Sequence, residues 1–100
     1  MVKLALFARL EAKPGKEDEV AKFLGTGLEL AKQEETTRLW FALRLGQTTF
    51  AVFDAFSDEK GRQNHLNGPI AKALMAKAAE LLVTPPTIEP ADVLGAKLPN

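Results

Sequence analysis

The spacing of apolar residues changes between a two-residue and a helical period several times along the chain. Residues 2–12 are rich in Val, Leu and Phe and are followed by Pro14-Gly15, which is typical of a strand that ends in a turn. From Lys16 to Ala31 the apolar positions follow helical spacing, and the acidic first turn suits the helix dipole. The chain therefore begins with a predicted strand and helix.

The middle of the chain predicts a hairpin followed by a second helical region. Two apolar segments, Thr36–Leu45 and Thr48–Phe56, flank Gly46-Gln47, which predicts two antiparallel strands joined by a short turn. A helical region then begins near Ser57, whose hydroxyl can cap the helix. Asn67-Gly68-Pro69 interrupts this region, since glycine can end one helix and proline can open the next.

The last third of the chain completes a familiar order of elements. Helical spacing resumes over Ile70–Val83, Pro85-Pro86 breaks it, and Thr87–Leu98 is predicted to be the last strand. One hundred residues are enough for one modest core, so residues 1–100 are expected to form a single domain. The order βαββαβ predicts a ferredoxin-like α+β fold, in which two helical regions cover one face of a four-stranded antiparallel sheet.

Both faces of the predicted sheet are substantially apolar. In the third strand, alternate positions form two apolar sets: Phe50, Val52 and Phe56 on one side, and Ala51, Phe53 and Ala55 on the other. Two helices can cover only one face, so a monomer would expose a large apolar patch on the other. We therefore expect a homodimer in which the two sheets pack face to face, with an interface of about 2,000 Å² or more.

Composition excludes several classes of function. Lys plus Arg and Asp plus Glu both number 13, so no net charge would attract nucleic acid or an anionic membrane. The absence of cysteine excludes disulfides and thiolate metal sites, and one histidine cannot supply a two-histidine metal site. The apolar run Leu4–Ala8 is too short for a signal peptide or a membrane span, so we expect a cytoplasmic protein.

Asp54 and His65 are the candidate catalytic residues. His65 has the unperturbed pKa of a general base, or it could hydrogen-bond a substrate phenol; alternatively it packs near the break at Asn67. Asp54 falls on a mostly apolar face, where a carboxylate should be paired or have a raised pKa. It could orient His65 or Arg44, act as a base itself, or form a structural salt bridge.

Five further residues are candidates for a substrate-binding pocket. Trp40 and Arg44 share one face of the second strand, and the indole could form the wall of a pocket for a flat aromatic ligand. Phe56, Phe23 and Leu74 are the remaining candidates for the lining, although filling of the core would explain them equally well.

The chain resembles the antibiotic biosynthesis monooxygenase family of dimeric α+β barrels, which includes small proteins similar to quinol monooxygenases. The resemblance extends over about residues 2 to 98. It rests on Lys13-Pro14-Gly15-Lys16, Trp40, Phe53-Asp54-Ala55-Phe56, Asp58-Glu59, Arg62, His65-Leu66 and Gly68-Pro69-Ile70-Ala71.

The resemblance implies a function as well as a dimer built by sheet stacking. Characterised members oxidise electron-rich aromatics or quinols with molecular oxygen, without metal or flavin, in a cavity between the helices and the sheet. It implies that Asp54 and His65 are the polar groups of that cavity and that Trp40 and Phe56 are its apolar walls. No cofactor is therefore expected.

Some members of the family degrade haem, using an asparagine on the first strand and a tryptophan on the third. Those positions are Ala8 and Phe56 here, so haem degradation is disfavoured, and the chain has no tyrosine for proton transfer. Two alternatives stay open. One is a non-catalytic ligand-binding or stress-related dimer, and the other is a small isomerase or lactone-processing enzyme with the same acid–base pair.

Overall fold

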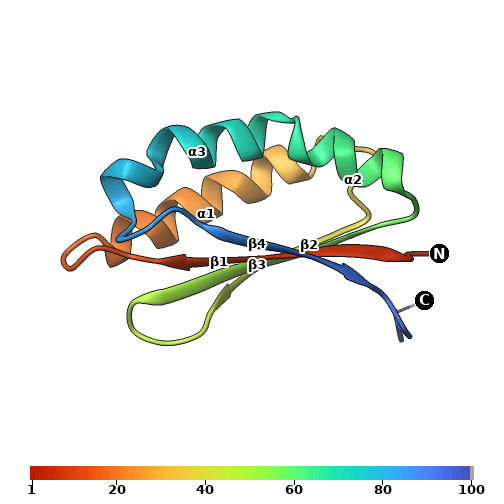
Figure 1. The fold of residues 1–100 in the computed structure, drawn as a ribbon, viewed down its shortest axis with the longest axis horizontal. Helices are drawn as coiled ribbons and strands as arrows, with labels where there is room; N and C mark the ends of the chain where they lie inside the picture. Colours follow the sequence, from red (N-terminus) through yellow and green to blue (C-terminus); the bar gives the residue numbers. More distant parts are fainter. Residues whose placement is uncertain (100) are drawn as a thin grey trace.

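The computed structural model describes residues 1–99, which form one sheet and three helices. Four antiparallel strands lie in the order β2-β3-β1-β4, and the helices lie together on one face (Figure 1). In chain order the elements are β1 (Leu4–Glu11), α1 (Glu17–Ala31), β2 (Leu39–Arg44), β3 (Thr49–Phe56), α2 (Glu59–Leu66), α3 (Pro69–Leu81) and β4 (Thr87–Asp92). The ferredoxin-like α+β fold predicted from the sequence is confirmed.

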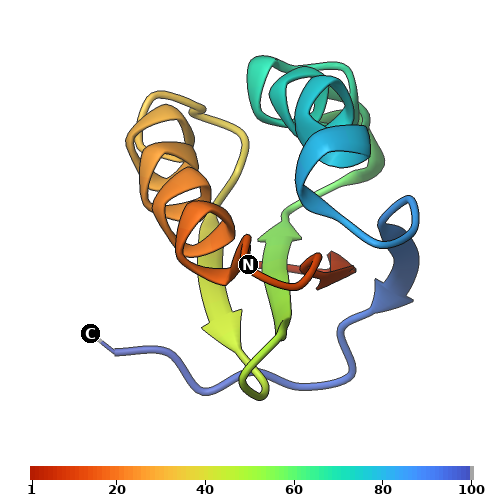
Figure 2. The same ribbon diagram turned by 90° about the vertical axis from the view of Figure 1, so that its left-hand side faces the viewer.

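The two strands at the edges of the sheet are shorter than predicted. β4 pairs only with β1, and its last residue Asp92 lies opposite Leu4, the first residue of β1. Beyond Asp92 there is no strand left to pair with, so the predicted strand to Leu98 is wrong. The chain instead leaves the sheet on the face opposite the helices (Figure 2). β2 begins at Leu39 because residues 34–37 form a turn, closed by the Thr37 amide donating to the Glu34 carbonyl.

The second helical region consists of two helices, as the Asn67-Gly68-Pro69 sequence predicts. Gly68 is the N-cap of α3, and Pro69 is the first residue of the helix. Proline is tolerated at this first position because the amide proton that it lacks would have no partner within the helix. The cap of α2 is Asp58, whose carboxylate accepts from the Gly61 amide at 2.9 Å, so the prediction of Ser57 as the cap is wrong by one residue. An aspartate cap also places negative charge at the positive end of the helix dipole.

The face of the sheet under the helices, the covered face, holds most of the core. Leu10, Val20 and Phe50 are among its most buried residues. Trp40 of β2 packs closely against α1 at Gly27. A Cβ atom added at Gly27 would lie only 3.3 Å from the Cζ2 atom of Trp40. The position of the indole beside the site described below therefore depends on a glycine in α1.

The opposite face, the open face, carries apolar side chains that no helix covers. Phe41 and Phe53 stack there with ring centroids 6.4 Å apart, and Phe41 is 50% exposed. At one end of this face Val93 packs against Val2, Ala5 and Ala55. None of the helices within residues 1–99 is both long enough and apolar enough to cross a membrane.

Candidate active site on the covered face

Asp54 and His65, predicted as a pair, are in contact beneath the helices. Asp54 points from β3 into the covered face, and His65 lies in the last turn of α2. The His65 Nε2 atom and the Asp54 Oδ2 atom are 2.9 Å apart. The two residues are only 2% and 7% exposed, and they are the buried polar residues of the described chain. Of the partners that the sequence left open for Asp54, the structure places His65, and not Arg44, in contact with it.

A third residue, Glu34, completes the site and was not predicted from the sequence. Its Oε1 atom lies 2.7 Å from the His65 Nδ1 atom, on the other side of the imidazole from Asp54. The Thr37 hydroxyl donates to the same Oε1 atom at 2.7 Å. One signal was available in the sequence. Glu34 follows the end of α1, where the helix dipole disfavours negative charge, so an acidic residue there calls for a cationic partner.

The charges of this Glu34–His65–Asp54 triad depend on each other. Burial would lower the pKa of His65, but its hydrogen bonds to Asp54 and Glu34, together with the charges of the two carboxylates, outweigh burial and raise that pKa above 6.5. Burial raises the pKa of Asp54, and the hydrogen bond and charge of His65 offset part of this rise. Asp54 and His65 therefore each favour the charged form of the other, while burial opposes both charges.

A small cavity of about 50 Å³ adjoins Asp54 and His65. Two polar atoms of its lining residues, Asp54 Oδ1 and Trp40 Nε1, are buried and have no hydrogen-bond partner among residues 1–99. The rest of the lining is apolar, from Leu6, Ala8, Val52, Leu66, Ile70, Ala71, Leu74 and Ile88. A ligand that reaches this cavity therefore meets one free acceptor and one free donor in hydrocarbon surroundings.

An open groove of about 460 Å³ lies between α1 and β2, and Trp40 lines both this groove and the small cavity. Arg44 is at the groove, with its guanidinium 4.9 Å from the centre of the Phe50 ring. Its Nε and Nη2 atoms donate to the carbonyls of Gly46 and Gln47. Trp40 thus lines both a small, largely apolar cavity that contains Asp54 and a larger groove to which Arg44 belongs.

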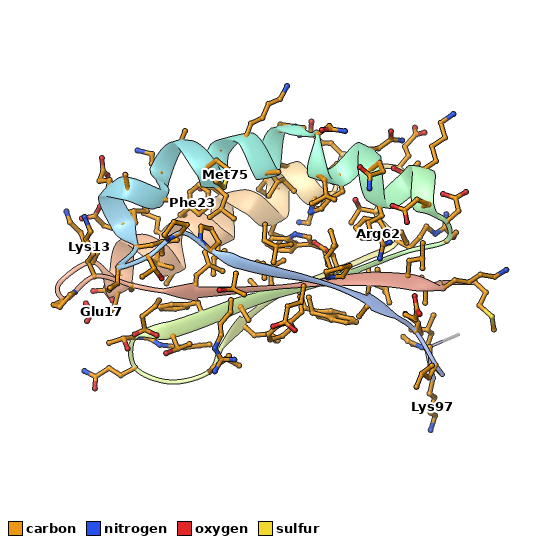
Figure 3. The ribbon with its side chains drawn as sticks, viewed as in Figure 1. Lys13, Glu17, Phe23, Arg62, Met75 and Lys97 are labelled. Atoms are coloured by element: carbon orange, nitrogen blue, oxygen red, sulfur yellow. The ribbon has the colours of Figure 1, made fainter. Side chains whose placement is uncertain are left out.

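The structure brings some of the other predicted lining residues to the site and places one elsewhere. Leu74 lines the small cavity, and the Phe56 ring packs against the His65 ring with centroids 5.5 Å apart. Phe23 packs against the core between α1 and α3. It lies in the half of the molecule that holds Lys13 and Glu17, whereas Arg62 of α2 lies in the other half (Figure 3). Phe23 is not among the residues that line the cavity beside His65.

The triad is suited to proton transfer. The two carboxylates contact opposite nitrogens of one imidazole, so they do not converge on a common point. Within residues 1–99 no group of three or more His, Asp or Glu side chains is arranged to hold a metal ion. What the arrangement supplies is a buried carboxylate with one oxygen that has no partner among residues 1–99, held in place by a histidine whose pKa is raised.

Comparison with known proteins defines the class first through the fold. No family model and no curated protein matches the sequence. Two solved structures named "putative antibiotic biosynthesis monooxygenase" share the fold. One is from Nitrosomonas europaea, with 14% identity, a TM-score of 0.82 and coverage of 92% of this chain and 90% of that one. The other is from Caulobacter crescentus, with 18% identity, a TM-score of 0.78 and coverage of 94% and 92%. The resemblance to the antibiotic biosynthesis monooxygenase fold is thereby confirmed.

A much more similar structure is a protein of unknown function from Nitrosomonas europaea. It is 62% identical, with a TM-score of 0.97 and coverage of 100% of this chain and 97% of that one. At this identity over the whole length, the chain belongs to the same family as that protein.

Proposed function

We propose that the protein is a cofactor-independent monooxygenase that oxidises a small aromatic or quinol substrate with molecular oxygen. Asp54 accepts the proton of a substrate hydroxyl, and His65 holds Asp54 in position. The deprotonated quinol is electron-rich enough to reduce oxygen itself. One oxygen atom forms a new C–O bond in place of a C–H bond, giving a hydroxyquinone, and the other leaves as water, so that quinol plus O₂ balances hydroxyquinone plus water.

The single observation that carries this proposal is the free Oδ1 atom of Asp54. A buried carboxylate oxygen without a partner is costly, and a hydroxyl group of a ligand would satisfy it. The Trp40 Nε1 proton, also without a partner among residues 1–99, could then be donated to the same ligand oxygen. One phenolic hydroxyl matches both needs at once.

The size of the cavity restricts how such a substrate binds. A cavity that holds benzene has a volume of roughly 150 Å³, whereas the small cavity beside Asp54 measures about 50 Å³. The hydroxyl end of a substrate fits there, but the ring does not. Because Trp40 lines both spaces, rotation of its indole would join the cavity to the groove, and we propose that the ring enters from the groove side.

We also propose the homodimer that the sequence predicts. Phe41 is 50% and Leu43 is 38% exposed, and both lie on the open face beside Phe53. A second copy packed against this face would remove these side chains from water.

Oxygen consumption tests the proposed reaction. Metal-free protein is incubated with reduced naphthoquinols, and oxygen uptake and incorporation of ¹⁸O from ¹⁸O₂ into the hydroxyquinone are measured. We expect uptake above the buffer rate, and a loss of about 10²-fold in Asp54→Asn, the lower range for a general base. Asp58→Asn is the matched control, because it removes the same charge while asparagine still caps α2. Uptake at the buffer rate with a broad panel of quinols would overturn the proposal.

The small volume of the cavity also favours a second candidate function, that of a non-catalytic dimer that binds a small ligand. This function predicts saturable binding of phenols without turnover. Calorimetry with 1-naphthol, run alongside the oxygen measurement, separates the two.

A further inference from the structure

We propose that Glu34 is a positioning residue of this site. Through its contact with His65 it holds the imidazole in its charged form and in a fixed orientation, and so keeps Asp54 available as a proton acceptor. The inference rests on the proposed function for the role of Asp54, but its physical content, the coupling of Glu34 to His65, is measurable without turnover.

The local structure holds Glu34 on the imidazole. Its Oε1 atom receives the Thr37 hydroxyl and lies 2.7 Å from His65 Nδ1, so two groups orient one oxygen. Its Oε2 atom lies over Gly68, where a Cβ atom would be only 3.2 Å away. The glutamate side chain is 14% exposed and that of His65 is 8% exposed, so water screens their interaction weakly.

Glu34 also favours the charged form of the imidazole. One imidazolium and one carboxylate would suffice for a neutral pair, but here the imidazole contacts a carboxylate at each nitrogen. With both carboxylates ionised, both ring nitrogens act as donors, which requires the charged form of the imidazole. Without Glu34, burial would favour neutral imidazole, and Asp54 would lose the positive charge that keeps it ionised.

The elements packed around His65 bring no other charge into contact with it. β3 contributes Asp54 and the apolar Phe56, and the turn after α1 contributes Glu34 and Thr37. The cavity residues from β1 and α3 are Leu6, Ile70, Ala71 and Leu74. The titration of His65 therefore reports on these two carboxylates.

The experiment uses the fact that His65 is the one histidine of the chain, so its imidazole gives a single set of ¹⁵N signals. The full-length protein is titrated by NMR as wild type, Glu34→Gln and Glu35→Gln. Glutamine can still accept from Nδ1 but carries no charge, and Glu35 is an exposed neighbour with no contact to His65. We expect the midpoint of His65 to lie above pH 6.5 in wild type and in Glu35→Gln. In Glu34→Gln it should fall by about one pH unit or more.

The same variants separate this inference from the proposed reaction. If quinol oxidation occurs, its pH profile should lose its alkaline side at a lower pH in Glu34→Gln than in Glu35→Gln. Glu34→Asp, which keeps the charge, should restore much of the midpoint, which a purely steric role would not predict. An unchanged midpoint in Glu34→Gln would overturn the inference. Should that variant fail to fold, a wild-type midpoint at or below 6.5 would overturn it equally. Absence of oxidation in every protein with the expected midpoints would instead overturn the proposed reaction.

Discussion

The two faces of the sheet carry opposite combinations of polarity and exposure. The covered face packs against the helices, yet it holds Asp54 and His65, the buried polar residues of the described chain. The open face is in contact with water, yet it carries Phe41 and Leu43 half-exposed and the stacked pair of Phe41 and Phe53. Each face departs from what stability of a monomer would favour.

These two departures have different physical meanings. Burying charges is costly even when they are paired, and apolar residues of similar volume are often as stable or more so. The triad is therefore better explained by chemistry than by stability. Exposed apolar side chains gain nothing from water, so they are better explained by a partner surface. The covered face is the candidate site, and the open face is the candidate interface.

The largest effect is expected from breaking the triad. His65→Ala leaves two buried carboxylates without their cation, so the free energy of unfolding should fall by about 3–5 kcal/mol. Urea denaturation followed by circular dichroism measures this change. Asn64→Ala, on the exposed side of the same helix, is the control and should change stability by less than about 1 kcal/mol. A loss in His65→Ala no greater than in the control would mean that the carboxylates are not coupled through the imidazole.

A smaller effect is expected on the open face. Phe41→Asp places a charge among apolar side chains, so dimer dissociation should become easier by about 2 kcal/mol or more if Phe41 lies at the centre of an interface. Met75→Asp is the matched control, since Met75 is 57% exposed on α3 and lies on the helical side of the molecule (Figure 3). Sedimentation equilibrium gives both dissociation constants. A wild-type chain that stays a 10.9 kDa monomer at micromolar concentration would contradict the proposal that the open face is a dimer interface.

The pH dependence of stability sharpens the account of the covered face. The folded pKa of His65 is raised above 6.5, so folded protein binds more protons than unfolded protein above that pH. Its stabilising contribution is complete below pH 6.5 and is lost as the pH rises through the folded pKa. The loss amounts to about 1.4 kcal/mol for each pH unit between the two pKa values.

Urea unfolding between pH 6 and pH 9 measures this loss. The raised pKa of Asp54 acts in the same direction at lower pH, where the lowered pKa values of Glu11 and Glu59 oppose it, so the alkaline range is the cleaner one. His65→Gln should show no decline of this kind. A wild type whose stability does not fall across this range would exclude a charged His65 in the folded protein.

The smallest effect is expected beside Trp40. Gly25→Ala places its Cβ in open space and should stabilise α1 by about 1 kcal/mol through helix propensity. Gly27→Ala meets the indole at 3.3 Å, so contact with Trp40 should cancel part or all of that gain. Thermal unfolding of the two variants gives the difference, and equal stabilisation would show that the indole moves aside at no cost.

The local sequence pattern predicted the fold, and it identified Asp54 and His65, but not Glu34, as candidates for the site. The alternation around Asp54 and the break at Asn67-Gly68-Pro69 were sufficient to predict its face and the two helices α2 and α3. The end of β4 was not predictable, because it depends on where β1 begins on the other side of the pairing.

Glu34 was missed for a related reason. Its position after the end of α1 is shared with Glu35, so this signal does not single out Glu34, and the contact with His65 joins residues 31 positions apart. The placement of Arg44 at the groove and not at the small cavity likewise depends on packing of α1 against β2, which residue spacing alone does not specify.

The most direct test of the central claim, that the covered face binds and activates a phenolic substrate, is a crystal structure with a reduced naphthoquinol bound under anaerobic conditions. The account predicts a ligand hydroxyl about 3 Å from Asp54 Oδ1, with the indole of Trp40 displaced and the ring reaching into the groove between α1 and β2. A ligand seated in the groove without contact to Asp54, or bound only on the open face, would contradict it.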